Sequence, residues 1–89
     1  MFGKITEIID NYVYVENSTH ELKSNILNIH VIFEEVNRKV VGEVVSVNKD
    51  IIKIFLVGEI RKNVFYSGVM RKPSFLCIPR IIYKQELEF

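Results

Sequence analysis

The sequence has few of the residues that metal or thiol chemistry requires. Its single cysteine, Cys77, excludes an internal disulfide. Leu76 and Ile78 flank Cys77, a setting typical of a small buried hydrophobic side chain, whereas a reactive thiolate needs basic or helix-terminal surroundings. The two histidines, His20 and His30, have no HxxxH or CxxC spacing to other ligands. We therefore expect no metal site.

Long apolar runs and glycine-rich loops are also missing. No window approaches the roughly 18 apolar residues of a membrane span, and the N-terminus has no apolar signal core. The sequence thus predicts a cytoplasmic protein without a membrane contact. The segments around Gly58 and Gly68 do not form a run ending in Lys-Ser/Thr that could cradle a phosphate. No Ser/His/Asp arrangement can be argued, and Glu34-Glu35 is interpreted as a solvated strand end, so we expect neither catalysis nor a bound cofactor.

Most of the sequence consists of short segments rich in β-branched residues. The 89 residues make one domain, and 48% of them are hydrophobic, which is ample for one core. Turn residues at 10–11, 35–38 and 48–50 separate the expected strands, which are residues 4–9, 12–15, 29–34, 39–47 and 51–57. In the third strand, Ile29, Val31 and Phe33 lie on one face and His30 and Ile32 on the other. This spacing predicts an all-β fold of about five to seven short, mainly antiparallel strands, as a sandwich or as a small closed or partly open β-barrel.

Residues 56–75 do not alternate cleanly and are expected to form a long connection. The chain should leave the fifth strand within residues 57–60. A connection of this length in a small domain is usually functional or an interface. The expected turns, bulges or bends lie at Gly42, Gly58, Gly68 and Pro73.

Two further segments have a less definite pattern. Residues 76–78 and 80–83 read as two short extended pieces on either side of Pro79, which cannot donate to a ladder. Residues 22–27 fit either one helical turn or an extended crossing.

Charge is distributed unevenly along the chain. Residues 1–50 contain 5 basic and 8 acidic residues, whereas residues 51–89 contain 7 basic and 3 acidic residues. The C-terminal half could therefore present a basic face. Basic residues interleaved with Phe65, Tyr66 and Phe75 are also what a barrel that binds single-stranded nucleic acid uses. The alternative is that the aromatic rings are core and the basic side chains are solvated.

An ordered set of residues resembles a known family. The set is Gly3-Lys4-Ile5, Val41-Gly42-Glu43-Val44, Leu56-Val57-Gly58-Glu59-Ile60, Phe65, Gly68-Val69, Arg71 and Pro73. It is similar to the HAS-barrel, the N-terminal β-barrel of HerA-like hexameric DNA-translocating ATPases, which is related to the N-terminal barrel of ATP synthase α and β subunits. Family members usually have a Gly-Asp turn before the third strand. Here we expect Asn28 to take the left-handed conformation instead.

The resemblance implies a role in assembly. Residues 1–83 would be the barrel and residues 84–89 the start of a linker or helix toward a RecA-like ATPase module outside this sequence, where ATP and magnesium would bind. The barrel itself would be non-catalytic, help to assemble a hexameric ring and dock partners such as a NurA-type nuclease, with weak or indirect DNA contact. The expected interface residues are Glu59, Arg61, Lys62, Phe65, Arg71 and Lys72. The alternative function is a free-standing barrel that binds single-stranded nucleic acid through its basic C-terminal half.

Overall fold

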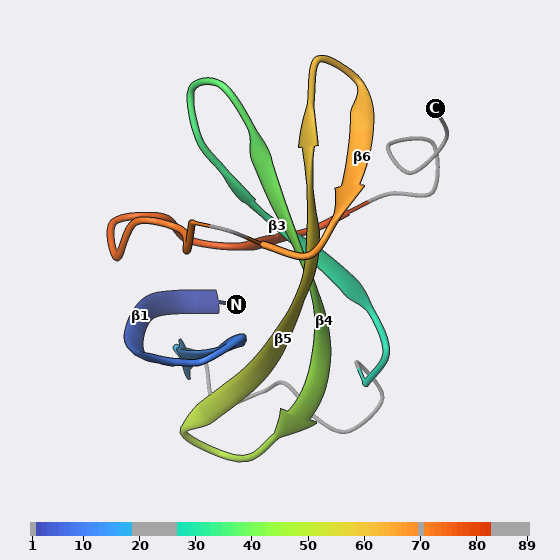
Figure 1. Cartoon of the computed structure of the whole chain (residues 1–89). Coiled ribbons are helices and arrows are strands. Elements are labelled where there is room, and N and C mark those ends of the chain that lie inside the picture. The colour runs from blue at the N-terminus through green and yellow to red at the C-terminus, as the bar shows by residue number, and fades with distance from the viewer. Residues whose placement is uncertain (1, 19–26, 70, 83–89) are drawn as a thin grey trace.

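Seven antiparallel strands form one strongly curled sheet, seen in a computed structural model that describes residues 2–18, 27–69 and 71–82 (Figure 1). The sheet order is β1-β2-β5-β4-β3-β7, and β6 also pairs with β5. The strands are β1 (Phe2–Ile9), β2 (Tyr12–Asn17), β3 (His30–Glu34), β4 (Lys39–Val47), β5 (Ile51–Arg61), β6 (Val64–Ser67) and β7 (Arg80–Ile81). The predicted all-β, partly open barrel of antiparallel strands is confirmed. No helix in the described residues is long and apolar enough to cross a membrane.

Short turns join β1 to β2, β3 to β4 and β4 to β5, as the sequence predicts. Asp10 has φ 52° between β1 and β2, and Asn28 has φ 68° just before β3. Short polar side chains tolerate this left-handed conformation. Between β4 and β5, the Asn48 side chain accepts hydrogen bonds from the backbone N–H groups of Asp50 (2.9 Å) and Ile51 (2.7 Å). The turn chemistry therefore sets these strand ends locally.

The segment expected to leave the sheet instead continues it. β5 runs through Gly58 to Arg61, and the chain returns at once as β6. Lys62 (φ 50°) and Asn63 (φ 61°) form the two-residue turn, whose left-handed pair matches the twist of a hairpin. The prediction of a long connection over residues 56–75 was wrong for residues 56–67, which lie in β5, its turn and β6, because Lys-Asn is a weak turn signal. Gly58 is therefore a strand residue, packed beneath the Phe65 ring.

A β-bulge in β5 changes which face its side chains occupy. Val41 pairs with Gly58 but Gly42 pairs with Leu56, so Val57 is an extra residue in β5. An extra residue reverses the alternation beyond it. Ile52, Ile54 and Leu56 thus point inward before the bulge, and Glu59 points inward after it. The bulge or bend was predicted at Gly42. The register does shift between Val41 and Gly42, but the inserted residue is Val57 on the opposite strand.

Two apolar clusters occupy the two faces of the curled sheet. The larger cluster contains Val13, Phe33, Val44 and Ile54 with six other buried residues. The smaller contains Ile32, Val41, Ile60 and Ile82. β3 contributes to both, since Val31 and Phe33 join one cluster and Ile32 the other, in the predicted phase. Burial on both sides makes β3 and the middle of β4 the centre of the domain.

The last part of the described chain differs from the expected extended pieces. Residues 76–78 are not a strand, because the Cys77 N–H donates to the Ser74 carbonyl (3.0 Å) and closes a turn. β7 contains only two residues, paired with β3 directly after the buried Pro79. Gly68 has φ 80°, so a turn occurs there as predicted. Pro73 is buried in the irregular segment that follows. The expected linker at 84–89 and most of segment 22–27 lie outside the described residues.

Gly42 is a sensitive position because its backbone approaches β5 closely. A Cβ atom at residue 42 would lie 2.4 Å from Ile54 Cγ2. We expect Gly42→Ala to lower the free energy of unfolding by about 1–3 kcal/mol, the usual cost of overpacking a core. Urea denaturation measures this change. The exposed Ser46→Ala on the same strand should stay within about 0.5 kcal/mol of the parent. An unchanged midpoint for Gly42→Ala would contradict the close approach.

Candidate functional site

A buried arginine, Arg38, makes several hydrogen bonds at one end of the sheet face that carries the larger apolar cluster, which we call the inner face. The residue is only 6% exposed and belongs to the turn between β3 and β4. Its Nε donates to Glu35 Oε1 (2.7 Å), and its Nη1 donates to Glu59 Oε2 (3.3 Å). Nη1 also donates to the Arg71 carbonyl (2.7 Å), and Nη2 to the Lys72 carbonyl (3.0 Å). We call Arg38, Glu35 and Glu59, with the two carbonyl groups, the Arg38 cluster.

The strand register brings the cluster together. Val40 lies opposite Glu59, so Arg38, two residues before Val40, is a diagonal neighbour of Glu59 on the same face. This placement depends on the bulge at Val57, which turns Glu59 inward. Glu35 reaches Arg38 across the turn, where the Glu35 N–H also donates to the Arg38 carbonyl (2.9 Å). The sequence interpretation of Glu35 as a solvated residue was therefore wrong.

The Arg38 cluster fixes the irregular segment 71–79 onto the barrel. Besides the two carbonyl contacts to Arg38, the Ser74 N–H donates to Glu35 Oε2 (3.3 Å). Lys72 Nζ donates to Asn11 Oδ1 (2.6 Å) in the turn between β1 and β2. Farther along, Cys77 packs against the larger core cluster and its Sγ lies 3.6 Å from the Glu34 carbonyl. This segment is therefore held at several points.

Four of the six predicted interface residues converge on the cluster: the side chain of Glu59 and the carbonyl groups of Arg71 and Lys72 belong to it, and Arg61 borders it. Glu59 is 7% exposed and forms intrachain pairs, so its carboxylate is not on the surface. The Arg61 side chain is 54% exposed, with Nε 3.7 Å from Glu59 Oε2 and the guanidinium carbon 4.3 Å from the Tyr66 ring centre. The Arg71 side chain is 78% exposed, 3.9 Å from Glu35 Oε1. Lys72 contributes its carbonyl and is otherwise bonded to Asn11.

The other two predicted residues lie on the β5–β6 hairpin, away from the Arg38 contacts. Lys62 is at the tip of the hairpin, and Phe65 packs over Gly58 on the outer face. Sequence reasoning missed Arg38 and Glu35. One signal was available. Arg38 lies two residues before Val40 and six before Val44, and side chains at even spacing on a strand point to the same face, so Arg38 could have been placed on the core side of β4.

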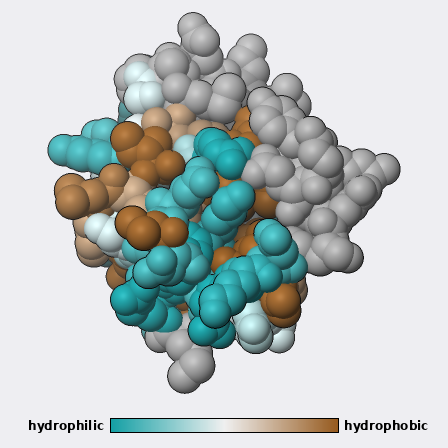
Figure 2. All heavy atoms as spheres, turned by 90° about the horizontal axis from the view of Figure 1, so that it is seen from above, coloured by the Kyte–Doolittle hydropathy of each residue, from teal (hydrophilic) through white to brown (hydrophobic). Residues whose placement is uncertain are grey.

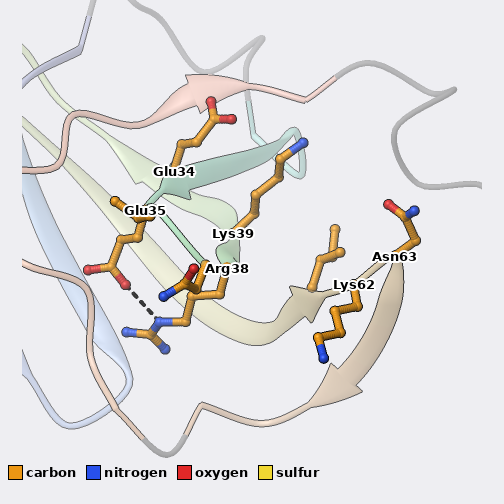
Figure 3. A pocket seen from close by; sticks show the side chains of 9 residues that line it. Glu34, Glu35, Arg38, Lys39, Lys62 and Asn63 are labelled. Carbon is orange, nitrogen blue, oxygen red and sulfur yellow. Dashed lines mark hydrogen bonds and ion pairs between the residues drawn. The ribbon is translucent and has the colours of Figure 1, made fainter.

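The β3–β4 turn and the β5–β6 turn line a pocket of about 200 Å³ (Figure 3). Lys39 lies on one side, and Lys62 and Asn63 lie on the other. Its volume is below the range of roughly 300–1,000 Å³ typical of small-molecule sites. Viewed from this end of the barrel, polar side chains gather in the middle and apolar ones lie beside them (Figure 2). This arrangement suits contact with another surface more than enclosure of a small ligand.

Basic side chains at this end of the molecule are paired with acidic ones. Arg80 Nε lies 3.5 Å from Glu34 Oε1, in addition to the pairs that Arg38, Arg61 and Arg71 make. The acidic residues of the N-terminal half are therefore interspersed with the basic residues of the C-terminal half. The uneven charge along the sequence does not become a continuous basic stripe among the described residues.

An apolar turn projects beside the cluster. Leu76 is 93% exposed, and Phe75 and Ile78 are 55% and 59% exposed. The Leu76 N–H donates to Ser74 Oγ (3.1 Å), and the Cys77 N–H closes the turn. We call residues 75–78 the apolar knob. Its turn is hydrogen-bonded, and segment 71–74 before it is fixed by the Arg38 cluster, so little backbone entropy remains to be lost on contact.

Groups capable of metal binding are not assembled in the ranges 2–18, 27–69 and 71–82, where no three His, Cys, Asp or Glu side chains come together. His30 lies on β3. His20 lies outside the described residues.

Desolvation, and next the negative charge of Glu35, raise the pKa of the Cys77 thiol.

Comparison of the sequence with protein-family models finds no match, and comparison with curated proteins finds none either.

Loss of the Arg38 guanidinium should destabilise the domain strongly. We expect Arg38→Met to lower the free energy of unfolding by about 3–5 kcal/mol, because Glu35, Glu59 and two carbonyl groups lose their donor. Urea denaturation followed by circular dichroism measures it. The matched control is Arg80→Met, which removes an exposed pair worth no more than about 1 kcal/mol. Equal effects of the two substitutions would rule out a special role for Arg38.

Cys77 should be a slow nucleophile. Its raised pKa and partial burial lower the thiolate fraction near neutral pH, and the thiolate is the reactive form. We expect alkylation by iodoacetamide at pH 7.5 to be slower in the folded protein than in urea, and the folded protein to need a higher pH for half-maximal rate. A folded-state rate equal to or above the unfolded one would show that burial and Glu35 do not suppress ionisation.

Proposed function

We propose that this chain is a non-catalytic assembly and docking domain of a HerA-like hexameric DNA-translocating ATPase. The observation that carries the proposal is the apolar knob, which leaves Phe75, Leu76 and Ile78 exposed on a turn fixed by its own hydrogen bonds and by the Arg38 cluster. Large exposed apolar groups on a rigid support mark interaction sites. The curled antiparallel barrel is the fold that the family resemblance implies.

In this proposal the barrel acts by geometry alone. Two exposed features, the knob and the β5–β6 hairpin, are available for contact with a neighbouring subunit or a partner such as a NurA-type nuclease. The hairpin adds Val64 and Tyr66, which are 48% and 44% exposed. ATP and magnesium bind in a RecA-like module that follows the barrel. DNA is moved by that module, and its contact with the barrel is weak or indirect.

Single-stranded nucleic-acid binding is the alternative that the charge distribution suggested. It is less favoured, because Glu34, Glu35 and Glu59 lie among the arginines that would contact phosphates. A nucleic acid is held by successive cationic contacts along its backbone. Intervening carboxylates oppose such a track.

Removal of the apolar knob should impair assembly without unfolding the domain. In the longer protein, we expect Phe75→Ser/Leu76→Ser to weaken subunit or nuclease association by roughly 30-fold, the effect of losing an interface hot spot of about 2 kcal/mol. Multi-angle light scattering and nuclease co-purification measure it. Ile9→Ser, an exposed apolar residue on β1, is the matched control and should have no effect.

Deletion of the whole barrel gives the more general test. The proposed function is wrong if the protein without residues 1–83 still forms hexamers and still engages its nuclease. It is also wrong if the knob variant assembles as well as the Ile9 control.

A further inference from the structure

Three arginines converge on a second pocket, which lies on the inner face beside β6. Arg38, Glu59, Arg61 and Arg71 line a space of about 250 Å³. Arg38 is largely committed, because it donates to two carboxylates and two carbonyl groups. The capacity of this pocket to bind something else therefore depends on Arg61 and Arg71.

Arg61 and Arg71 are only loosely paired. Their nitrogens lie 3.7 Å and 3.9 Å from the carboxylate oxygens of Glu59 and Glu35. Good hydrogen bonds from N–H to O are about 2.7–3.2 Å long. Both side chains are more than half exposed, so a small rearrangement would let them donate to an incoming oxyanion. The Tyr66 ring, 4.3 Å from the Arg61 guanidinium carbon, keeps Arg61 at the mouth of the pocket.

The net charge of the pocket residues together with the neighbouring Glu35 would be neutralised by one monoanion. Three guanidinium groups and the carboxylates of Glu35 and Glu59 leave one net positive charge. We propose that the pocket receives the carboxylate of one Asp or Glu side chain presented by a partner protein. This inference rests on the proposed docking function and names the chemistry of the group that docks.

A protein carboxylate fits the surroundings better than a phosphate of a nucleic acid. Val64 and Tyr66 lie on the same face as Arg61 and are half exposed, so an apolar neighbour of the acidic residue would have a surface to contact. A polynucleotide would instead bring several phosphates past Glu34 and Glu35, which pair with Arg80 and Arg71.

Binding of a short peptide to the chain alone tests the inference. The probe is acetyl-Leu-Glu-Leu-amide, and its matched control is acetyl-Leu-Gln-Leu-amide. The side-chain Nε–H signals of Arg61 and Arg71 are followed by ¹⁵N NMR during titration. We expect saturable shifts with the Glu peptide and about tenfold weaker binding of the Gln peptide, as for loss of one charged hydrogen-bonded contact.

Two double variants show whether Arg61 and Arg71 themselves bind the peptide or whether the net charge of the protein attracts it. Arg61→Gln/Arg71→Gln should weaken binding of the Glu peptide by at least about tenfold, whereas Lys4→Gln/Lys49→Gln makes the same change in net charge elsewhere and should not. Backbone amide spectra show whether each variant remains folded. Equal binding of both peptides, or unchanged binding by the arginine variant, would overturn the inference. Tighter binding of a single-stranded oligothymidylate at the same two arginines would overturn it in favour of nucleic acid.

The same variants distinguish this inference from the proposed function. If the knob substitutions abolish assembly of the longer protein but Arg61→Gln/Arg71→Gln leaves it intact, the docking function stands and the carboxylate site is wrong. If the Glu peptide binds as expected but the protein assembles without its barrel, the docking function is wrong and the carboxylate site remains.

Discussion

A buried guanidinium group must have its donors satisfied, and this requirement determines much of the architecture at one end of the barrel. Arg38 meets it with partners from three places in the chain: Glu35 in its own turn, Glu59 on β5 and the carbonyl groups of segment 71–72. None of these partners can be removed without leaving a polar group buried and unpaired. The cluster therefore joins the β3–β4 hairpin, β5 and an irregular segment into one rigid unit.

The bulge at Val57 is what makes this cluster possible. An unbroken β5 would continue the inward series of Ile52, Ile54 and Leu56 to Gly58 and Ile60. The extra residue exchanges the faces, so Glu59 points inward to Arg38 and Ile60 joins the smaller apolar cluster. One inserted residue thus converts the end of a hydrophobic strand into one side of a polar site. The bulge also increases the local coiling of the sheet, which helps it to curl.

Rigidity at the cluster and exposure beside it are connected. Segment 71–74 is fixed by the cluster, and the turn that follows carries Phe75, Leu76 and Ile78 outward. Apolar groups on a fixed backbone lose less entropy when a partner covers them than groups on a disordered loop. The loosely paired Arg61 and Arg71 lie at the edge of the same cluster. Apolar contact and charge recognition are therefore placed next to each other, as in interfaces where charged groups set specificity.

The sequence by itself determined the strands whose signals are local. The β-branched residues of β1 to β4 and the Asn and Asp turns are local signals, and so these elements and the all-β fold were predictable. The Arg38 cluster was not, because it depends on the register of β4 against β5 and on a bulge with no composition signal. Glu59 was expected at an interface because the chain was predicted to leave the strand within residues 57–60. Only the tertiary structure, through one extra residue at Val57, decides that Glu59 is buried and that Arg61 and Arg71 flank it.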